Sequence, residues 1–141
     1  MSEAENLYGA EHVKRYRETG GDVGHIWKEG STVLLLTTTG RKTGEPRTTP
    51  LIYAEDGDRY VIVASKGGAP EDPGWYRNLD KSPEVELQVK DDVFPARART
   101  AEGEERDRLW QKANEIWPHY EEYQQKTDRE IPVVVLERVN A

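Results

Sequence analysis

STVLLLTTTGRKTGEPRTTPLIYAEDGDRYVIVAS, residues 31–65, predicts three consecutive β-strands. The run VLLL at 33–36 is apolar throughout and precedes three β-branched threonines, which is typical of a strand buried on both faces, or nearly so. A second strand is predicted at 47–56 and a third at 59–65, with a tight turn at Gly57-Asp58 between them. Strands joined by such short turns run antiparallel, so this stretch predicts a β-meander.

Four helices are expected around these strands. The first has apolar residues at three-residue spacing, ends at paired glycines and belongs to a helical N-terminal segment, 1–27. Asp72 is placed to cap the second helix, whose first turn would include Pro73. The sequence predicts helices at 8–20, 73–81, 103–117 and 119–127.

Two further regions complete the predicted sheet. Apolar and polar residues alternate in the first half of 84–102, and Asp91-Asp92 turns the chain, so this region predicts a hairpin with one solvent-exposed face. The apolar segment 131–139 predicts a closing strand. About six strands with interleaved helices predict an α+β fold on a small, mostly antiparallel barrel. A chain of 141 residues is expected to form one domain, 1–141.

The charge balance narrows the classes of partner. The chain has 20 Lys and Arg against 27 Asp and Glu, a net charge of −7, whereas a general nucleic-acid surface needs a basic balance. The segment 37–50 runs against this trend, with three basic residues and one acidic residue, a local charge of +2. The 17 basic and 26 acidic residues elsewhere give −9. We therefore expect no nucleic-acid partner and one focused cationic site.

The residue inventory argues against several kinds of site. The chain has no cysteine, which excludes disulfides, thiolate zinc sites and cysteine nucleophiles, and its three histidines lack HExxH-like spacing, so no metal site is expected. Neither a GxSxG elbow nor a P-loop is present. No apolar run approaches the roughly 20 residues that span a bilayer, and no secretory signal is visible, so a cytoplasmic protein is expected.

GRKTGEPR, residues 40–47, has the composition of an anion-binding turn. Its glycines allow the backbone to turn sharply and to approach a ligand closely. Arg41 and Arg47 offer forked donors to phosphate or carboxylate, and Lys42 adds a compact positive charge. Lys66, at the end of the third strand, should lie at the same edge of a meander, so both loops can converge on one organic anion. Ordinary solvated turn residues are the alternative interpretation.

Aromatic residues near these loops could wall a site for a flat heterocycle. Trp75 and Tyr76 follow the SKGG loop, and Tyr120 and Tyr123 have polar neighbours, which favours a surface position at the rim of a pocket. A tyrosine hydroxyl can donate a hydrogen bond or a proton, and Ser65, at a strand end beside glycines, offers another hydroxyl. The alternative is that the tryptophans are core anchors.

Several stretches together resemble one known family. TTTGRKTG at 37–44, VASKGG at 63–68, PGWYRNL at 73–79 and IPVVVLE at 131–137 stand in the order found in deazaflavin (coenzyme F420)-dependent nitroreductases and quinone reductases. The resemblance covers nearly the whole chain. It implies a split β-barrel like that of flavin reductases and a 5-deazaflavin cofactor whose tail carries a phosphate, a lactyl group and a polyglutamate.

The resemblance also implies roles for individual residues. The basic turn would hold the phosphate and carboxylates of the tail, and the loop 64–68 would run along the deazaflavin ring, with backbone N–H groups at its carbonyl edge. The residues expected to bind the cofactor on this basis are Arg41, Lys42, Arg47, Thr48, Pro50, Ala64, Ser65, Lys66, Gly67, Gly68, Trp75, Tyr76 and Asn78.

The implied reaction is hydride transfer from reduced coenzyme F420 to an electron-poor acceptor. Ser65, Tyr120 and Tyr123 are the candidate catalytic residues, because the charge that develops on the acceptor must be hydrogen-bonded or protonated. Trp117 and Ile52 stand where some relatives carry tyrosine, which favours a menaquinone-like quinone or an enone over a nitroaromatic acceptor.

Other interpretations remain open at this point. An FMN-dependent split-barrel reductase or oxidase would use the same fold with a different cofactor, and a non-catalytic protein could bind or store coenzyme F420. The expected partner is a small-molecule acceptor. The sequence leaves open whether the protein is a monomer or a homodimer, and whether it makes weak peripheral contact with a membrane that holds a lipid quinone.

Overall fold

The computed structural model describes residues 7–139, so residues 1–6 of the expected N-terminal segment lie outside it. The strands in this part are β1 (Val33–Thr39), β2 (Pro46–Ile52), β3 (Ala54–Asp56), β4 (Arg59–Val63), β5 (Glu84–Val89), β6 (Asp92–Thr100) and β7 (Val133–Arg138). The helices are α1 (Gly9–Thr19), α2 (Gly74–Lys81), α3 (Gly103–Ile116) and α4 (His119–Gln125), with 3₁₀ turns η2 (Lys28–Gly30) and η3 (Lys66–Gly68). The four predicted helices are therefore confirmed.

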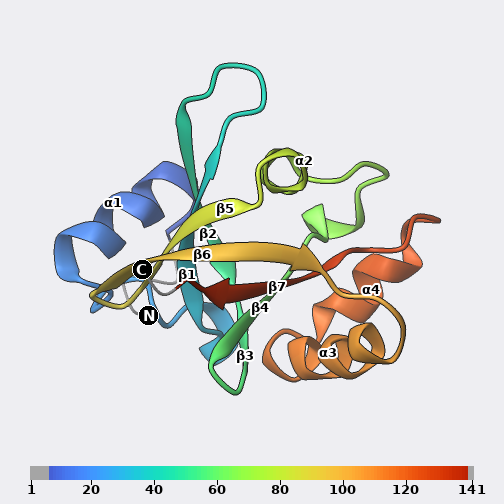
Figure 1. Cartoon of the computed structure of the whole chain (residues 1–141). Helices are drawn as coiled ribbons and strands as arrows, with labels where there is room; N and C mark the ends of the chain where they lie inside the picture. Colours follow the sequence, from blue (N-terminus) through green and yellow to red (C-terminus); the bar gives the residue numbers. More distant parts are fainter. Residues whose placement is uncertain (1–6, 140–141) are drawn as a thin grey trace.

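The strands form one antiparallel sheet in the order β2-β1-β5-β6-β7-β4-β3. The sheet is strongly curled (Figure 1). Its two edge strands, β2 and β3, are consecutive in the chain, with one residue between them. α1 lies on one side of this curled sheet, and α3 and α4 lie on the other. The fold is the predicted α+β split barrel.

The predicted second strand, 47–56, is two strands at opposite ends of the sheet. β2 pairs with β1, whereas β3 pairs with β4. Tyr53 lies between them, where its N–H donates to the Thr32 carbonyl oxygen at 3.0 Å and its hydroxyl is 2.8 Å from His25 Nε2. The bend at Tyr53 takes the chain from one edge strand to the other, so the sheet has seven strands where about six were expected.

The apolar run 33–36 is buried on both faces, as predicted. Leu34 and Leu36 pack inside the barrel with side chains from β4, β5, β6 and β7. Val33 and Leu35 pack on the outside against apolar side chains of α1. Because both faces of the strand are buried, a continuous apolar run contributes to two cores at once. Full burial of each such side chain stabilises the fold by roughly 1.5–3 kcal/mol.

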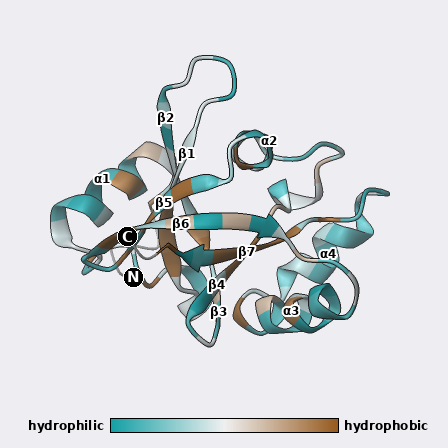
Figure 2. Cartoon of the chain, in the orientation of Figure 1, coloured by the Kyte–Doolittle hydropathy of each residue, from teal (hydrophilic) through white to brown (hydrophobic). Residues whose placement is uncertain are grey.

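β7 repeats this arrangement at the other side of the barrel. Val134 and Leu136 are buried in the interior, and Val133 and Val135 pack beneath α3. Hydrophobic residues accordingly concentrate on the strands, while the end of the β1–β2 hairpin, which projects from the barrel, is hydrophilic (Figure 2). The projecting hairpin carries the basic turn predicted from the sequence.

α1 is anchored to the barrel by a buried tyrosine. The Tyr16 hydroxyl donates to the Val33 carbonyl oxygen at 3.0 Å and accepts from the Lys90 N–H at 2.7 Å. Lys90 has a φ of 58°, and the β5–β6 hairpin turns at Lys90-Asp91, one residue before the predicted position. No helix in residues 7–139 is both long enough and apolar enough to cross a bilayer.

Candidate functional site

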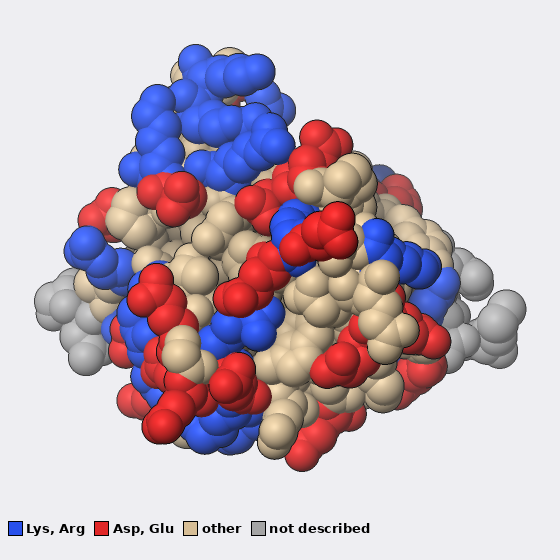
Figure 3. All heavy atoms as spheres, turned by 90° about the vertical axis from the view of Figure 1, so that its right-hand side faces the viewer, with Lys and Arg blue, Asp and Glu red and all other residues tan. Residues whose placement is uncertain are grey.

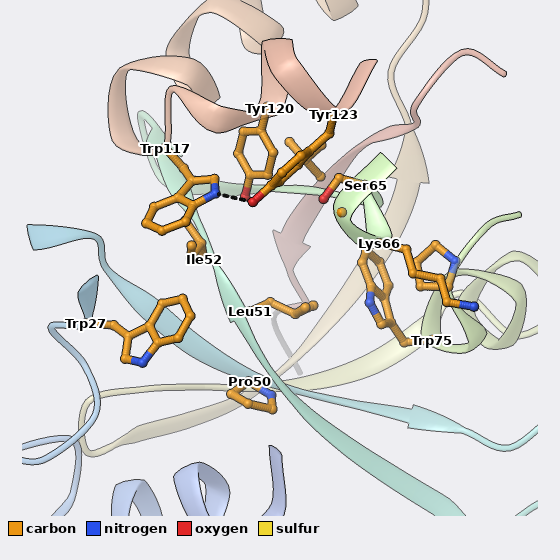
Figure 4. A pocket seen from close by; sticks show the side chains of 13 residues that line it. Trp27, Pro50, Leu51, Ile52, Ser65, Lys66, Trp75, Trp117, Tyr120 and Tyr123 are labelled. Carbon is orange, nitrogen blue, oxygen red and sulfur yellow. Dashed lines mark hydrogen bonds between the residues drawn. The ribbon is translucent and has the colours of Figure 1, made fainter. Parts of the chain in front are cut away.

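A cavity of about 340 Å³ lies where β2, α2, α4 and the loop after β4 meet (Figure 4). We call it the main cavity because all three candidate catalytic residues line it. Three tryptophans line it, Trp27 and Trp117 on one side and Trp75 on the other. The β2 segment 50–52 crosses between them and contributes apolar side chains. This is an open space with aromatic walls, which suits a flat ring.

Trp27 and Trp117 form a stacked pair. Their ring centroids are 5.9 Å apart and their planes are inclined by 26°. The Trp117 indole N–H also donates to the Tyr123 hydroxyl at 3.3 Å. Nothing in the local pattern around Trp27 marks it as a site residue, and sequence reasoning missed it. The fold brings it to Trp117 from far away in the chain.

Three hydroxyl groups line the main cavity, those of Ser65, Tyr120 and Tyr123. Tyr120 is only 5% exposed, because its ring packs beside Trp110, so the predicted surface position was wrong for this residue. Burial raises the pKa of Tyr120, which keeps its hydroxyl protonated at neutral pH. Within residues 7–139, neither this hydroxyl nor that of Ser65 has a hydrogen-bond partner. Both are thus available to a ligand.

The loop after β4 adopts a left-handed conformation and packs tightly on α4. Lys66, Gly67 and Gly68 have φ angles of 46°, 63° and 85°. A Cβ on Gly68 would lie 2.6 Å from the carbonyl oxygen of Tyr123, so only glycine permits this approach. The Lys66 ammonium extends to Glu71, at 3.2 Å. The loop thereby holds the cavity-lining Ser65 at a fixed position relative to the tyrosines of α4.

An arginine just before β7 supports this loop from behind. The Arg129 guanidinium donates to the carbonyl oxygens of Ser65 (2.8 Å), Ala69 (2.9 Å) and Ala64 (3.2 Å) and to the Asp72 carboxylate (2.9 Å). Sequence reasoning missed Arg129 and assigned Asp72 as the cap of α2. That assignment was wrong, because the N-cap is the following proline and the Asp72 carboxylate pairs with Arg129.

The β1–β2 hairpin encloses a second space, the basic hollow, of about 170 Å³. Its lining includes Arg41, Lys42, Arg47 and Asn78. Figure 3 shows Lys and Arg side chains gathered over the projecting end of the molecule. The Arg41 guanidinium donates to Asn78 Oδ1 at 3.0 Å, and the Lys81 ammonium donates to the Arg41 carbonyl oxygen at 3.0 Å. Several cationic groups therefore surround one hollow, as an anion site requires.

α2 links the main cavity to the basic hollow. Pro73 and Trp75, at its beginning, line the cavity, and Asn78 lines the hollow. Asn78 is 6% exposed and accepts hydrogen bonds from both the backbone N–H and the guanidinium of Arg41. The two loops expected to converge thus lie on either side of α2, with Lys66 at the cavity and the basic turn at the hollow.

The predicted site residues divide into three groups. Pro50, Ser65, Lys66, Gly67, Trp75, Tyr120 and Tyr123 line the main cavity, and Arg41, Lys42, Arg47 and Asn78 line the basic hollow. Thr48, Ala64, Gly68 and Tyr76 line neither space. The Thr48 hydroxyl bonds to Thr37 and Arg17, and the Tyr76 hydroxyl bonds to Thr100, so both are engaged elsewhere.

Metal ligation finds no support in the described part of the chain. Residues 7–139 contain no group of three or more His, Asp or Glu side chains placed to hold a metal ion.

Relatives of known sequence share most of the chain. Residues 8–138 match the protein family described as F420H(2)-dependent quinone reductase. The F420H(2)-dependent quinone reductase Rv1261c of Mycobacterium tuberculosis is 50% identical over 130 residues, which cover 90% of this chain and 87% of the relative. The family match includes every residue that lines the main cavity or the basic hollow.

Solved structures agree with these matches. A structure described as an F420-H2 dependent reductase (FDR-A) superposes with a TM-score of 0.70 at 49% identity, over 74% of this chain and 93% of that chain. A second, described as a domain-swapped dimer, has a TM-score of 0.73 at 45% identity, over 90% and 95% of the two chains. The chain therefore belongs to the F420H(2)-dependent quinone reductase family, whose reductases use coenzyme F420 as cofactor.

Proposed function

We propose that the main cavity is where this enzyme reduces a quinone, with reduced coenzyme F420 as the hydride donor. The observation that carries the proposal is the combination of an aromatic cavity and a basic hollow on either side of α2. When bound, the reduced deazaflavin supplies the hydride. The protein supplies the binding energy, the orientation and a protonated hydroxyl.

The two spaces suit the two halves of the cofactor. Apolar and aromatic side chains suit the flat ring, and we assign Pro50, Ser65, Gly67 and Trp75 to it. Guanidinium and ammonium groups suit a phosphate and several carboxylates, and we assign Arg41, Lys42 and Arg47 to the tail. Lys66 lines the cavity, and its ammonium pairs with Glu71. Asn78 positions the Arg41 guanidinium.

We assign the stabilisation of the reduced quinone oxygen to Tyr120, with Tyr123 and Ser65 beside it. A quinone oxygen gains negative charge as the ring accepts hydride, and a neutral hydroxyl in a low-dielectric cavity stabilises that charge. Tyr120 suits this role because its side chain is largely buried, while its hydroxyl stays protonated and has no partner within residues 7–139. The Trp117 indole N–H fixes the Tyr123 hydroxyl.

Binding and turnover measurements test the proposal in two stages. Oxidised coenzyme F420 should lose or shift its fluorescence on titration with the protein, and FMN should compete poorly. A panel of quinones, enones and nitroaromatics should then show turnover with reduced coenzyme F420, fastest with quinones. Tighter FMN binding would support the FMN-dependent alternative. Cofactor binding without turnover of any acceptor would support a storage protein.

We also propose a cytoplasmic enzyme whose site works within one chain. The residues that we assign to both spaces come from a single copy, which a monomer suffices to provide. Because one solved relative is a domain-swapped dimer, a homodimer is the alternative, and light scattering during size-exclusion chromatography distinguishes the two.

The exposed Tyr8 and Ile26 offer apolar contacts for weak binding at a membrane surface, which vesicle flotation can measure.

A further inference from the structure

A second, smaller cavity lies beside the main cavity, on the side of α1. It encloses about 120 Å³, and we call it the α1 cavity. Its own lining consists of Leu7, Tyr8, Gly9, His12 and Val33, and it shares Trp27, Pro50 and Ile52 with the main cavity. Of the residues that line only this cavity, Tyr8 alone has a role assigned above, as an apolar contact at a membrane surface.

The shared residues make the two cavities neighbours. Pro50 and Ile52 are alternate residues of β2, so their side chains lie on one face of the strand. Trp27 is fixed by a hydrogen bond from its indole N–H to the Leu7 carbonyl oxygen, at 3.1 Å. The spaces thus meet at the side chains of three residues. A substituent on a ring in the main cavity would therefore lie close to the α1 cavity.

The α1 cavity offers contacts for hydrocarbon and few for a polar group. Aliphatic and aromatic side chains dominate its lining, and His12, which is 2% exposed, already bonds through Nε2 to the Gly24 carbonyl oxygen at 2.9 Å. At the outer side, Tyr8 packs edge-to-face on Trp27 with ring centroids 5.4 Å apart. Tyr8 is 57% exposed, so the outer side of the cavity lies at the protein surface.

We propose that the α1 cavity binds the hydrocarbon side chain of the quinone acceptor. This inference rests on the proposed function, because the quinone ring must occupy the main cavity. The volume suits a short branched segment next to the ring, and the exposed Tyr8 lets the rest of a longer chain leave toward the surface. α1 and Tyr8 then discriminate between quinones by their side chains, which the main cavity alone does not do.

Two acceptors of matched ring chemistry test this inference in the full-length protein with reduced coenzyme F420. One is a naphthoquinone that carries only a methyl group, and the other is the same naphthoquinone with one prenyl chain. Each methylene buried in the cavity should raise kcat/KM about fourfold, chiefly through KM. Tyr8→Ala should lower the preference for the prenylated quinone on the order of fivefold. Tyr8→Phe should keep it, because the ring remains.

Matched controls separate this inference from the proposed function. Val93→Ala truncates an apolar side chain that is similarly exposed but lies on β6, and it should leave the preference unchanged. In the unaltered protein, a chain of the same length that ends in a carboxylate should lose the advantage. An equal preference in Tyr8→Ala and the unaltered protein, with the methyl quinone still reduced, would overturn this inference alone. If the protein reduced neither quinone, the proposed function would be overturned, and this inference with it.

Discussion

The main cavity and the basic hollow lie on either side of α2, but they are built in different ways. The hollow is largely one hairpin, 40–47, closed by Asn78 from α2. The cavity combines side chains from both ends of the chain, from Trp27 to Tyr123. A local turn can change side chains with little effect on the fold, whereas the cavity depends on long-range packing. Substitutions should therefore affect stability and turnover at the cavity and mainly affinity at the hollow.

The largest effect is expected at the support of the cavity loop. Arg129→Ala removes the donors to three carbonyl groups and leaves Asp72 without its partner. The free energy of unfolding should fall by about 2–3 kcal/mol. Turnover should fall on the order of 100-fold, because the loop that carries Ser65 loses its position. Thermal denaturation and steady-state kinetics measure the two effects.

Conservative and surface variants distinguish positioning from general destabilisation. Arg129→Lys should recover part of the stability but little of the turnover, since an ammonium cannot reach all four acceptors. Arg97→Ala removes an exposed arginine that lies 3.8 Å from Glu84, and it should change stability by less than about 1 kcal/mol. If Arg129→Ala behaved like Arg97→Ala, the loop would not depend on this arginine.

The second effect concerns the hydroxyl of Tyr120. Tyr120→Phe keeps the buried ring and removes the donor, so kcat with a quinone should fall on the order of 100-fold, with little change in cofactor affinity. Because burial raises the pKa of Tyr120, activity should not depend on its ionisation near neutral pH. Tyr60→Phe, outside the main cavity, is the matched control. Equal kcat in Tyr120→Phe and the unaltered protein would move the role to Ser65 or Tyr123.

The difference between the two regions also explains how far the sequence could be interpreted. Alternation, turn residues and apolar runs predicted the helices and most strands, and the run 33–36 was correctly expected to be buried on both faces. The basic turn was visible because its residues are neighbours in the chain. Trp27 and Arg129 were missed because their partners are distant in sequence. The bend at Tyr53 was missed because only sheet closure divides an otherwise regular strand.

A smaller effect is expected at the basic hollow. Arg41→Ala should weaken coenzyme F420 binding about tenfold, since one charge-assisted contact is lost, and should leave kcat at saturation almost unchanged. The loss of affinity should grow with the length of the polyglutamate tail. It should shrink at high salt, because screening weakens the attraction between Arg41 and the tail in the unaltered protein. Fluorescence titration measures both trends, with Arg97→Ala as the control. An affinity that did not change would place the tail elsewhere.

The smallest effect is expected at a clasp over the aromatic wall. His119 Nε2 lies 2.8 Å from Glu29 Oε2, and His119 Nδ1 lies 3.0 Å from Glu122 Oε2. Glu29 belongs to η2, which follows Trp27, and His119 begins α4, which carries the cavity tyrosines. The clasp therefore joins the two segments that hold the Trp27–Trp117 pair.

The charge of His119 makes this clasp dependent on pH. The two carboxylates, Glu122 first and then Glu29, raise the pKa of His119 above its ordinary value. The stabilisation that the clasp provides is therefore fully present below the unfolded pKa of about 6.5 and is lost as pH rises through the folded pKa.

His119→Gln should lower Tm at about pH 5 and change it little at about pH 9. His12→Gln would not serve as a control, because His12 is buried. Glu122→Gln instead tests the same clasp from the carboxylate side. A Tm difference that was independent of pH would show that His119 stabilises the cavity wall by packing on Trp117, whose ring centroid is 4.6 Å away.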